Sequence, residues 1–209
     1  MKQVIRGTNT IVVVGAWNIA IFSQDWVKNN ILPEENFKVL FPSMIGCSLK
    51  FQTDILSFCI EGERLMFEII NEADADKAYV EIARVLRIIL RKLSHTPVRA
   101  LGTNFVYDSD SKFPVLESLS DNERLGEIIT LIGNGVKSQG LIRKFSISEN
   151  EELTIRLEST ESGTNRVDFN FNYNIAKAED VLNILGDEDQ LIVKNQKLAN
   201  QIVEDVYGK

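Results

Sequence analysis

The chain has 209 residues, 44% of them hydrophobic and 25% charged, which is enough to bury a sizeable core as one domain or two small halves. Its formal net charge of -7 argues against a broad phosphate-binding surface, because nonspecific affinity for nucleic acids comes from Lys and Arg. Two cysteines exclude a disulfide-rich scaffold, and no segment approaches the roughly 20 consecutive apolar residues of a transmembrane helix. We therefore expect a cytoplasmic protein with reduced thiols and no membrane span.

The first part of the chain is expected to form a strand, a short helix and a meander. Residues 10–15 are β-branched and apolar, and Ser23 then offers an N-cap for a helix that ends before Pro33. The period of the pattern then changes to two, which is typical of half-buried strands. Four short runs show this alternation: 37–41, 47–52, 56–60 and 65–69.

Residues 73–93 form the clearest predicted helix. Apolar residues recur there at steps of three and four, which is the period of a helix lying on a core. Asp74 and Asp76 stand near its start and Arg91 near its end, so the charges complement the helix dipole. The segment that follows, His95 to Pro97, ends the helix.

The same order of elements then begins again. Residues 98–107 are expected to form a strand, and Ser120 and Glu123 form a capping box for a helix that stops at Gly133. Three strands and two helices follow: strands 141–148, 153–159 and 167–175, and helices 178–185 and 191–207.

This order predicts an α+β fold with two tandem β-α-(β-meander)-α halves, 1–95 and 96–209, within one compact domain. The halves would share one curved antiparallel sheet with the helices on one face. In topology this arrangement resembles the saddle of TATA-binding-protein-like folds, although the two share no motif. A pair of separate two-layer sandwiches is the alternative.

The sheet face that the helices leave open is the first candidate site. In 167–175 the apolar residues alternate with amides, so Asn170, Asn172 and Asn174 would point to that face. Arg156 and Lys144 would join them from the neighbouring strands. These groups can hydrogen-bond an extended peptide, a sugar or base edges. The alternative is that they are the solvated positions of a half-exposed sheet.

Three further features are candidates for binding. Arg84, Arg87 and Arg91 share a helix face that can receive an acidic partner or phosphates, or is simply solvated, with Glu81 paired to Arg84. Trp17 is either a core residue or an exposed anchor for a partner. The loop 108–119 is the longest irregular stretch, and such loops are often binding elements.

No motif indicates a reaction, so we expect no catalytic residue, metal or cofactor. The only histidine, His95, lacks a recognisable Ser or Cys nucleophile motif, and the acidic pairs do not continue into a calcium loop. The leading hypothesis is a non-catalytic binding or assembly protein of a cytosolic complex, holding a protein partner or its own copy. It would use the open face, a sheet edge or the 108–119 loop. A nucleic-acid-binding module on the sheet, and a small-ligand binder or enzyme with a cleft between the halves, are the alternatives.

Overall fold

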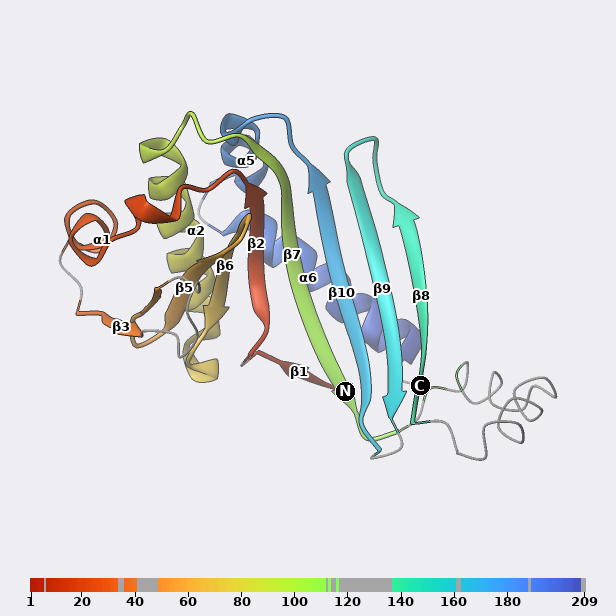
Figure 1. The fold of residues 1–209 in the computed structure, drawn as a ribbon. Helices are drawn as coiled ribbons and strands as arrows, with labels where there is room; N and C mark the ends of the chain where they lie inside the picture. The colour runs from red at the N-terminus through yellow and green to blue at the C-terminus, as the bar shows by residue number, and fades with distance from the viewer. Residues whose placement is uncertain are drawn as a thin grey trace.

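The protein is described by a computed structural model, shown in Figure 1. The described residues are 1–5, 7–33, 36–40, 49–111, 113, 116, 137–160, 163–187 and 189–207. Over these ranges the chain forms an α+β fold in which one open antiparallel sheet is covered by helices. The predicted helix with its capping box at Ser120, and most of the loop 108–119, lie outside the described residues.

All ten described strands belong to the one sheet. They are β1 (Lys2–Val4), β2 (Asn9–Gly15), β3 (Lys38–Leu40), β4 (Lys50–Gln52), β5 (Leu56–Glu61), β6 (Arg64–Ile69), β7 (Val98–Ser109), β8 (Ser138–Ser146), β9 (Glu151–Thr160) and β10 (Asn165–Asn174). The strand order is β3-β4-β5-β6-β2-β7-β10-β9-β8, and β1 pairs with β7 beyond the end of β2. Because β2 pairs directly with β7, the alternative of two separate sandwiches is wrong.

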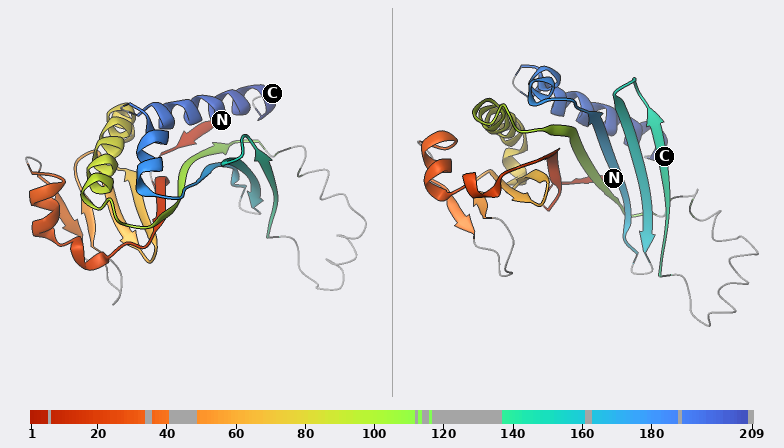
Figure 2. Two further views of the ribbon diagram at one scale, coloured as in Figure 1. Left: turned by 90° about the horizontal axis from the view of Figure 1, so that it is seen from above. Right: turned by 45° about the horizontal axis from the view of Figure 1, so that its top comes forward.

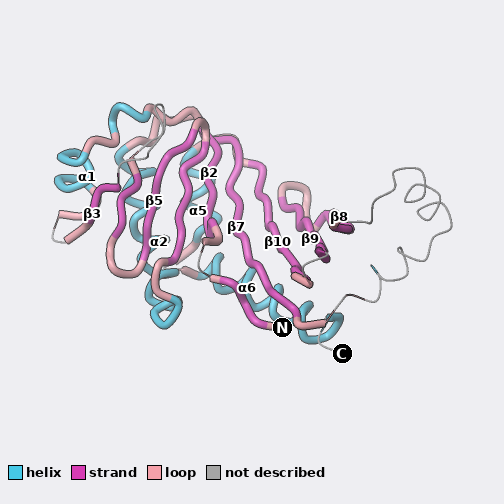
Figure 3. Tube along the Cα trace, turned by 60° about the horizontal axis from the view of Figure 1, so that its bottom comes forward, coloured by secondary structure: helices cyan, strands magenta, loops and turns pink. Residues whose placement is uncertain are grey.

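The helices lie on one face of the sheet. They are α1 (Gln24–Asn30), α2 (Ala75–Lys92), α5 (Ala178–Leu185) and α6 (Gln190–Ile202), and a last turn, Val203–Tyr207, continues α6. Figure 2, in the view from above, shows α2, α5 and α6 on the same side of the strands, with α1 at the end near β3. In Figure 3 the strands lie in front of these helices. No helix in the described ranges covers the opposite face of the sheet, which we call the open face.

The local predictions for α1 and α2 are confirmed. The Ser23 side chain accepts a hydrogen bond from the backbone N–H of Trp26 at 3.2 Å and caps α1. The predicted stripe of α2 is buried against the sheet, from Ala78 and Tyr79 at one end to Ile89 and Leu90 at the other. This burial explains why the periodicity of this segment was readable in the sequence.

The contact between α6 and the sheet is polar as well as apolar. Asn195 is fully buried, and its Nδ2 donates to the Thr103 hydroxyl and to the Tyr173 hydroxyl, both at 2.8 Å. The Tyr107 hydroxyl donates to Oδ1 of Asn200 at 2.6 Å. Burial raises the pKa of both tyrosines, so each stays a neutral donor. Directional bonds of this kind fix how α6 sits on the sheet, and hence which face stays open.

Candidate functional site

The open face is built by the alternation of β10. Val167, Phe169, Phe171 and Tyr173 are buried on the helix side, as the sequence pattern predicted. The residues between them are partly exposed on the other face. Asn170 and Asn172 therefore lie on the open face, and Asn174 is exposed at the end of the strand.

A groove of about 630 Å³ crosses this face over β2, β7 and β10. We call it the open-face groove. Its walls combine valine side chains with side-chain amides, and they come from both predicted halves of the chain. The lining includes Val12, Val14, Gly102, Val106, Asn104, Asn170 and Asn172, with Arg64 at one side and Asp168 at the other.

Gly102 forms the floor of the groove. It pairs with Val12 of β2 and with Asn172 of β10, so it lies between the apolar wall and the amide wall. A Cβ atom placed on Gly102 would lie 3.4 Å from Nδ2 of Asn170 and 3.8 Å from the carbonyl oxygen of Val12. The missing side chain thus contributes to the hollow, and a single Cβ atom would fit there in van der Waals contact.

Two of the amides are held in fixed orientations. Nδ2 of Asn170 donates to Oδ1 of Asn104 at 2.6 Å, and Nδ2 of Asn104 donates to the carbonyl oxygen of Asn9 at 2.7 Å. No described residue donates to Oδ1 of Asn170, so this oxygen is available as an acceptor. Asn172 makes no side-chain hydrogen bond to any residue in the described ranges, so both its donor and its acceptor are available to a ligand.

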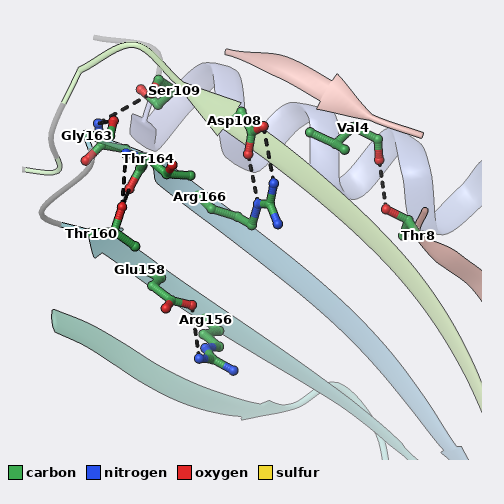
Figure 4. A network of polar contacts seen from close by, with 11 residues as sticks. Val4, Thr8, Asp108, Ser109, Arg156, Glu158, Thr160, Gly163, Thr164 and Arg166 are labelled. Atoms are coloured by element: carbon green, nitrogen blue, oxygen red, sulfur yellow. Dashed lines mark hydrogen bonds and ion pairs between the residues drawn. The ribbon is translucent and has the colours of Figure 1, made fainter. Parts of the chain in front are cut away.

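Charged groups border one end of the groove. Arg166 and Asp108 form a two-bond ion pair, Nε to Oδ1 at 2.8 Å and Nη2 to Oδ2 at 3.3 Å, which Figure 4 shows together with the hydrogen bond from Thr8 to Val4. Asp168, on the same strand, has a raised pKa because burial outweighs the attraction of Arg166 and Arg156. The carboxylate of Asp168 is therefore less well compensated than that of Asp108.

The basic residues predicted on this face lie outside the groove and are already paired. Nζ of Lys144 contacts Oε1 of Glu152 at 3.0 Å. Arg156 contacts Glu158 on its own strand at 3.0 Å, as drawn in Figure 4. The strand alternation thus places both residues on the open face as predicted, but the structure does not bring them together with the amides of the groove.

The arginines of α2 lie on the helical side and form no part of this groove. Arg84 pairs with Glu81, as the spacing of these residues predicted. Nη2 of Arg87 donates to the carbonyl oxygen of Gly186 at 2.8 Å, at the end of α5. Arg87 and Arg91 line a separate hollow of about 550 Å³ between α2 and α5. Part of the predicted anion site therefore serves helix packing.

Trp17 is a core residue, so its interpretation as an exposed anchor is wrong. It is 7% exposed, its Nε1 donates to the carbonyl oxygen of Val13 at 3.0 Å, and its ring packs edge-on against Phe22.

Sequence reasoning also missed Gly102 and Asn104. A glycine inside a predicted strand was the available signal, since such a residue often marks a place where another group comes close.

Within the described part of the chain, no three His, Cys, Asp or Glu side chains gather closely enough to hold a metal ion. No helix described there is both long and apolar enough to cross a bilayer. Comparison with protein-family models, with curated proteins and with solved structures finds no match.

Proposed function

We propose that the chain is a non-catalytic binding protein of a cytosolic complex, and that the open-face groove receives an extended segment of a partner polypeptide. The observation that carries the proposal is the pair of walls, valines on one side and amides on the other, where Asn170 is held by Asn104 and Asn172 has no side-chain partner among the described residues. The cytoplasmic location and the lack of a catalytic role, metal or cofactor stay predictions.

The geometry of β10 suits an extended polypeptide. Asn170 and Asn172 are two residues apart on one strand, so their side chains repeat about every 6.6 Å. The backbone of an extended chain repeats its outward N–H and C=O groups at the same interval. A carboxamide offers a donor and an acceptor side by side, as a peptide group does. A segment lying along β10 can therefore bond to both amides while its side chains contact Val12 and Val14.

The charges on the open face do not favour the nucleic-acid alternative. Lys144, Arg156 and Arg166 are each paired with a carboxylate, and Asp168 adds a negative charge at the groove. Paired cations release few counterions on meeting a phosphate backbone. A protein partner, which needs hydrogen bonds and apolar contact more than positive charge, fits better.

We also propose that the two halves are tandem repeats and that the sheet is a saddle similar to that of TATA-binding-protein-like folds. Sheet order supports this, because β2 pairs with β6 and β7 pairs with β10. The long opening strand of each half, β2 or β7, thus lies beside the last strand of the same half, and these two strands meet at the centre.

The proposal is tested by selecting short linear peptides from a displayed library. Peptides of about eight residues are long enough, since each extended residue spans roughly 3.3 Å and the groove runs from Arg166 to Asn172. The library is first depleted on the variant Gly102→Val, which fills the hollow, and is then selected on the natural chain. Retained peptides are measured by fluorescence anisotropy.

Two matched variants decide the outcome. Asn172→Ala removes an amide from the groove and is expected to weaken binding roughly two- to tenfold, the usual worth of one hydrogen bond. Asn174→Ala removes the same group from the same strand, but outside the groove, and is expected to leave binding unchanged. The proposal is wrong if no peptide distinguishes the natural chain from Gly102→Val, or if both Asn variants bind alike.

A further inference from the structure

One end of the open-face groove carries a carboxylate without a bonded partner. Asp168 of β10 lines the groove and lies directly opposite Val106 of β7. The side chain of Asp168 is half-buried, and no residue in the described ranges forms a hydrogen bond or an ion pair with it. A charge that is withdrawn from water without a partner costs free energy. A ligand that brings the missing partner would recover part of that cost.

The neighbouring arginines do not supply this partner, because each is bonded to another carboxylate. Arg166 makes two bonds to Asp108. Arg156 is bonded to Glu158, and Figure 4 draws both pairs. Together with Asp168 these groups are three carboxylates and two guanidiniums, so the cluster keeps one negative charge. In agreement with this count, burial raises the pKa of Asp168 although both arginines act to lower it.

Hydrocarbon lies beside this carboxylate. Val106, opposite Asp168, also pairs with Val4 of β1, and both valines line the groove. Lysine and arginine side chains combine a hydrocarbon stem with a charged end. The stem of such a side chain can lie on the valines while its charge meets the carboxylate. A purely polar or purely apolar side chain would match only one of the two surfaces.

We infer that the segment received by the groove carries a lysine or arginine whose charge pairs with Asp168. This inference rests on the proposed function, because it names a side chain of the peptide that the groove is proposed to receive. Arg64 lines the groove at the other side and repels a cation there. Only the end at Asp168 therefore favours a basic residue.

The register of the sheet determines where the basic residue stands in the peptide. Asp168 and Asn172 are four residues apart on β10, which is about 13 Å along the strand. Gly102 pairs with both Asn172 and Val12, so these two residues lie level with each other across the groove. An extended peptide also places residues that are four apart about 13 Å from each other and on the same side. The basic residue should therefore stand four positions from the apolar residue that contacts Val12.

The inference is tested on the peptides that the displayed library yields. Among peptides that bind the natural chain but not Gly102→Val, Lys or Arg should be enriched four positions from an apolar residue. One such peptide, and the same peptide with Gln in place of the basic residue, are titrated by fluorescence anisotropy against the natural chain and against Asp168→Asn. The Gln peptide should bind the natural chain roughly two- to fivefold more weakly, the usual worth of an ion pair that water can reach. Against Asp168→Asn, whose melting curve shows that it is folded, the two peptides should bind alike.

The matched control is Asp54→Asn. Asp54 is exposed in the turn before β5 and does not line the groove. Its substitution removes the same charge from the chain, so it measures the general attraction of a basic peptide to a protein of net charge -7. Asp54→Asn should keep the difference between the two peptides.

Two kinds of failure can be told apart. Peptides that need the groove but show no preference for a basic residue, or a preference that persists in Asp168→Asn, would overturn the inference and leave the proposed function in place. If no peptide distinguishes the natural chain from Gly102→Val, the proposed function fails and the inference fails with it.

Discussion

Replacing Gly102 with valine should leave the chain folded but abolish peptide binding. Gly102 lies within β7, and its backbone is not among the glycines with positive φ. A Cβ atom there would have Asn170 Nδ2 at 3.4 Å, the Val12 carbonyl oxygen at 3.8 Å and the Phe171 carbonyl oxygen at 3.9 Å as its nearest neighbours. All three are ordinary van der Waals contacts. A Cβ atom at position 102 therefore costs no backbone strain.

The expected gain in stability follows from the unfolded chain. Replacing a glycine where the native backbone tolerates a side chain raises the free energy of unfolding by about 0.4 to 1 kcal/mol. Valine suits a strand at least as well as alanine. For a chain of this length about 1 kcal/mol corresponds to roughly 2 to 4 °C in melting temperature. We expect Gly102→Val to melt slightly higher than the natural chain.

Gly102→Val should abolish peptide binding, because the methyl groups of the valine occupy the floor of the open-face groove between its two walls. Gly102→Ala should give an intermediate loss. Thermal melts and anisotropy titrations on the three proteins test both expectations together. A melting temperature lowered by several degrees would show that the hollow is too small for a valine side chain. Unchanged peptide affinity in a well-folded Gly102→Val would refute the placement of the ligand.

Three other predictions concern pH, stability and reactivity. Asp168→Asn should raise the melting temperature at pH 7, because folding raises the pKa of this half-buried carboxyl and so disfavours its ionised form. The gain should vanish as the pH falls below 3.8, where the carboxyl is neutral in both states, and a gain that persists there would contradict this reasoning. Asn195→Ala leaves the buried Thr103 hydroxyl without its described partner, while the Tyr173 hydroxyl keeps its bond to Glu151, and should lower the free energy of unfolding by roughly 1 to 3 kcal/mol, whereas Asn183→Ala, at an exposed residue of α5, should cost almost nothing in a denaturant titration. Burial raises the pKa of the Cys59 thiol to about 11. In a Cys47→Ser background, iodoacetamide at pH 8 should therefore modify Cys59 about a hundredfold more slowly than a free cysteine of pKa 9.0. A rate equal to that of the free thiol would show that Cys59 is not buried.

The parts of the fold that depend on local pattern could be predicted from the sequence. The alternation of β10 assigned Phe169 and Phe171 to the core and Asn170 and Asn172 to the open face, as the structure shows. The cap at Ser23 was likewise readable. In each case the residues that decide the structure are neighbours in sequence, so period and cap chemistry are sufficient.

The parts that depend on distant contacts could not be predicted. The pairing of Asn170 with Asn104 joins residues 66 positions apart, and it depends on the register of β10 against β7. Trp17 follows a strand end, where a core position and an exposed position look alike in the sequence, and its burial and its bond to Val13 decide the question. The register that one strand adopts against another is a property of the folded sheet.

The central claim, that the open-face groove holds an extended segment, is tested most directly by methyl NMR. Valine methyl groups are labelled, and a peptide selected on the natural chain is titrated in. The signals of Val12, Val14 and Val106 should shift together and saturate, since these side chains line the groove. The signal of Val80, on the helical side, should stay in place. Shifts confined to Val206, or to valines outside the groove, would contradict the claim.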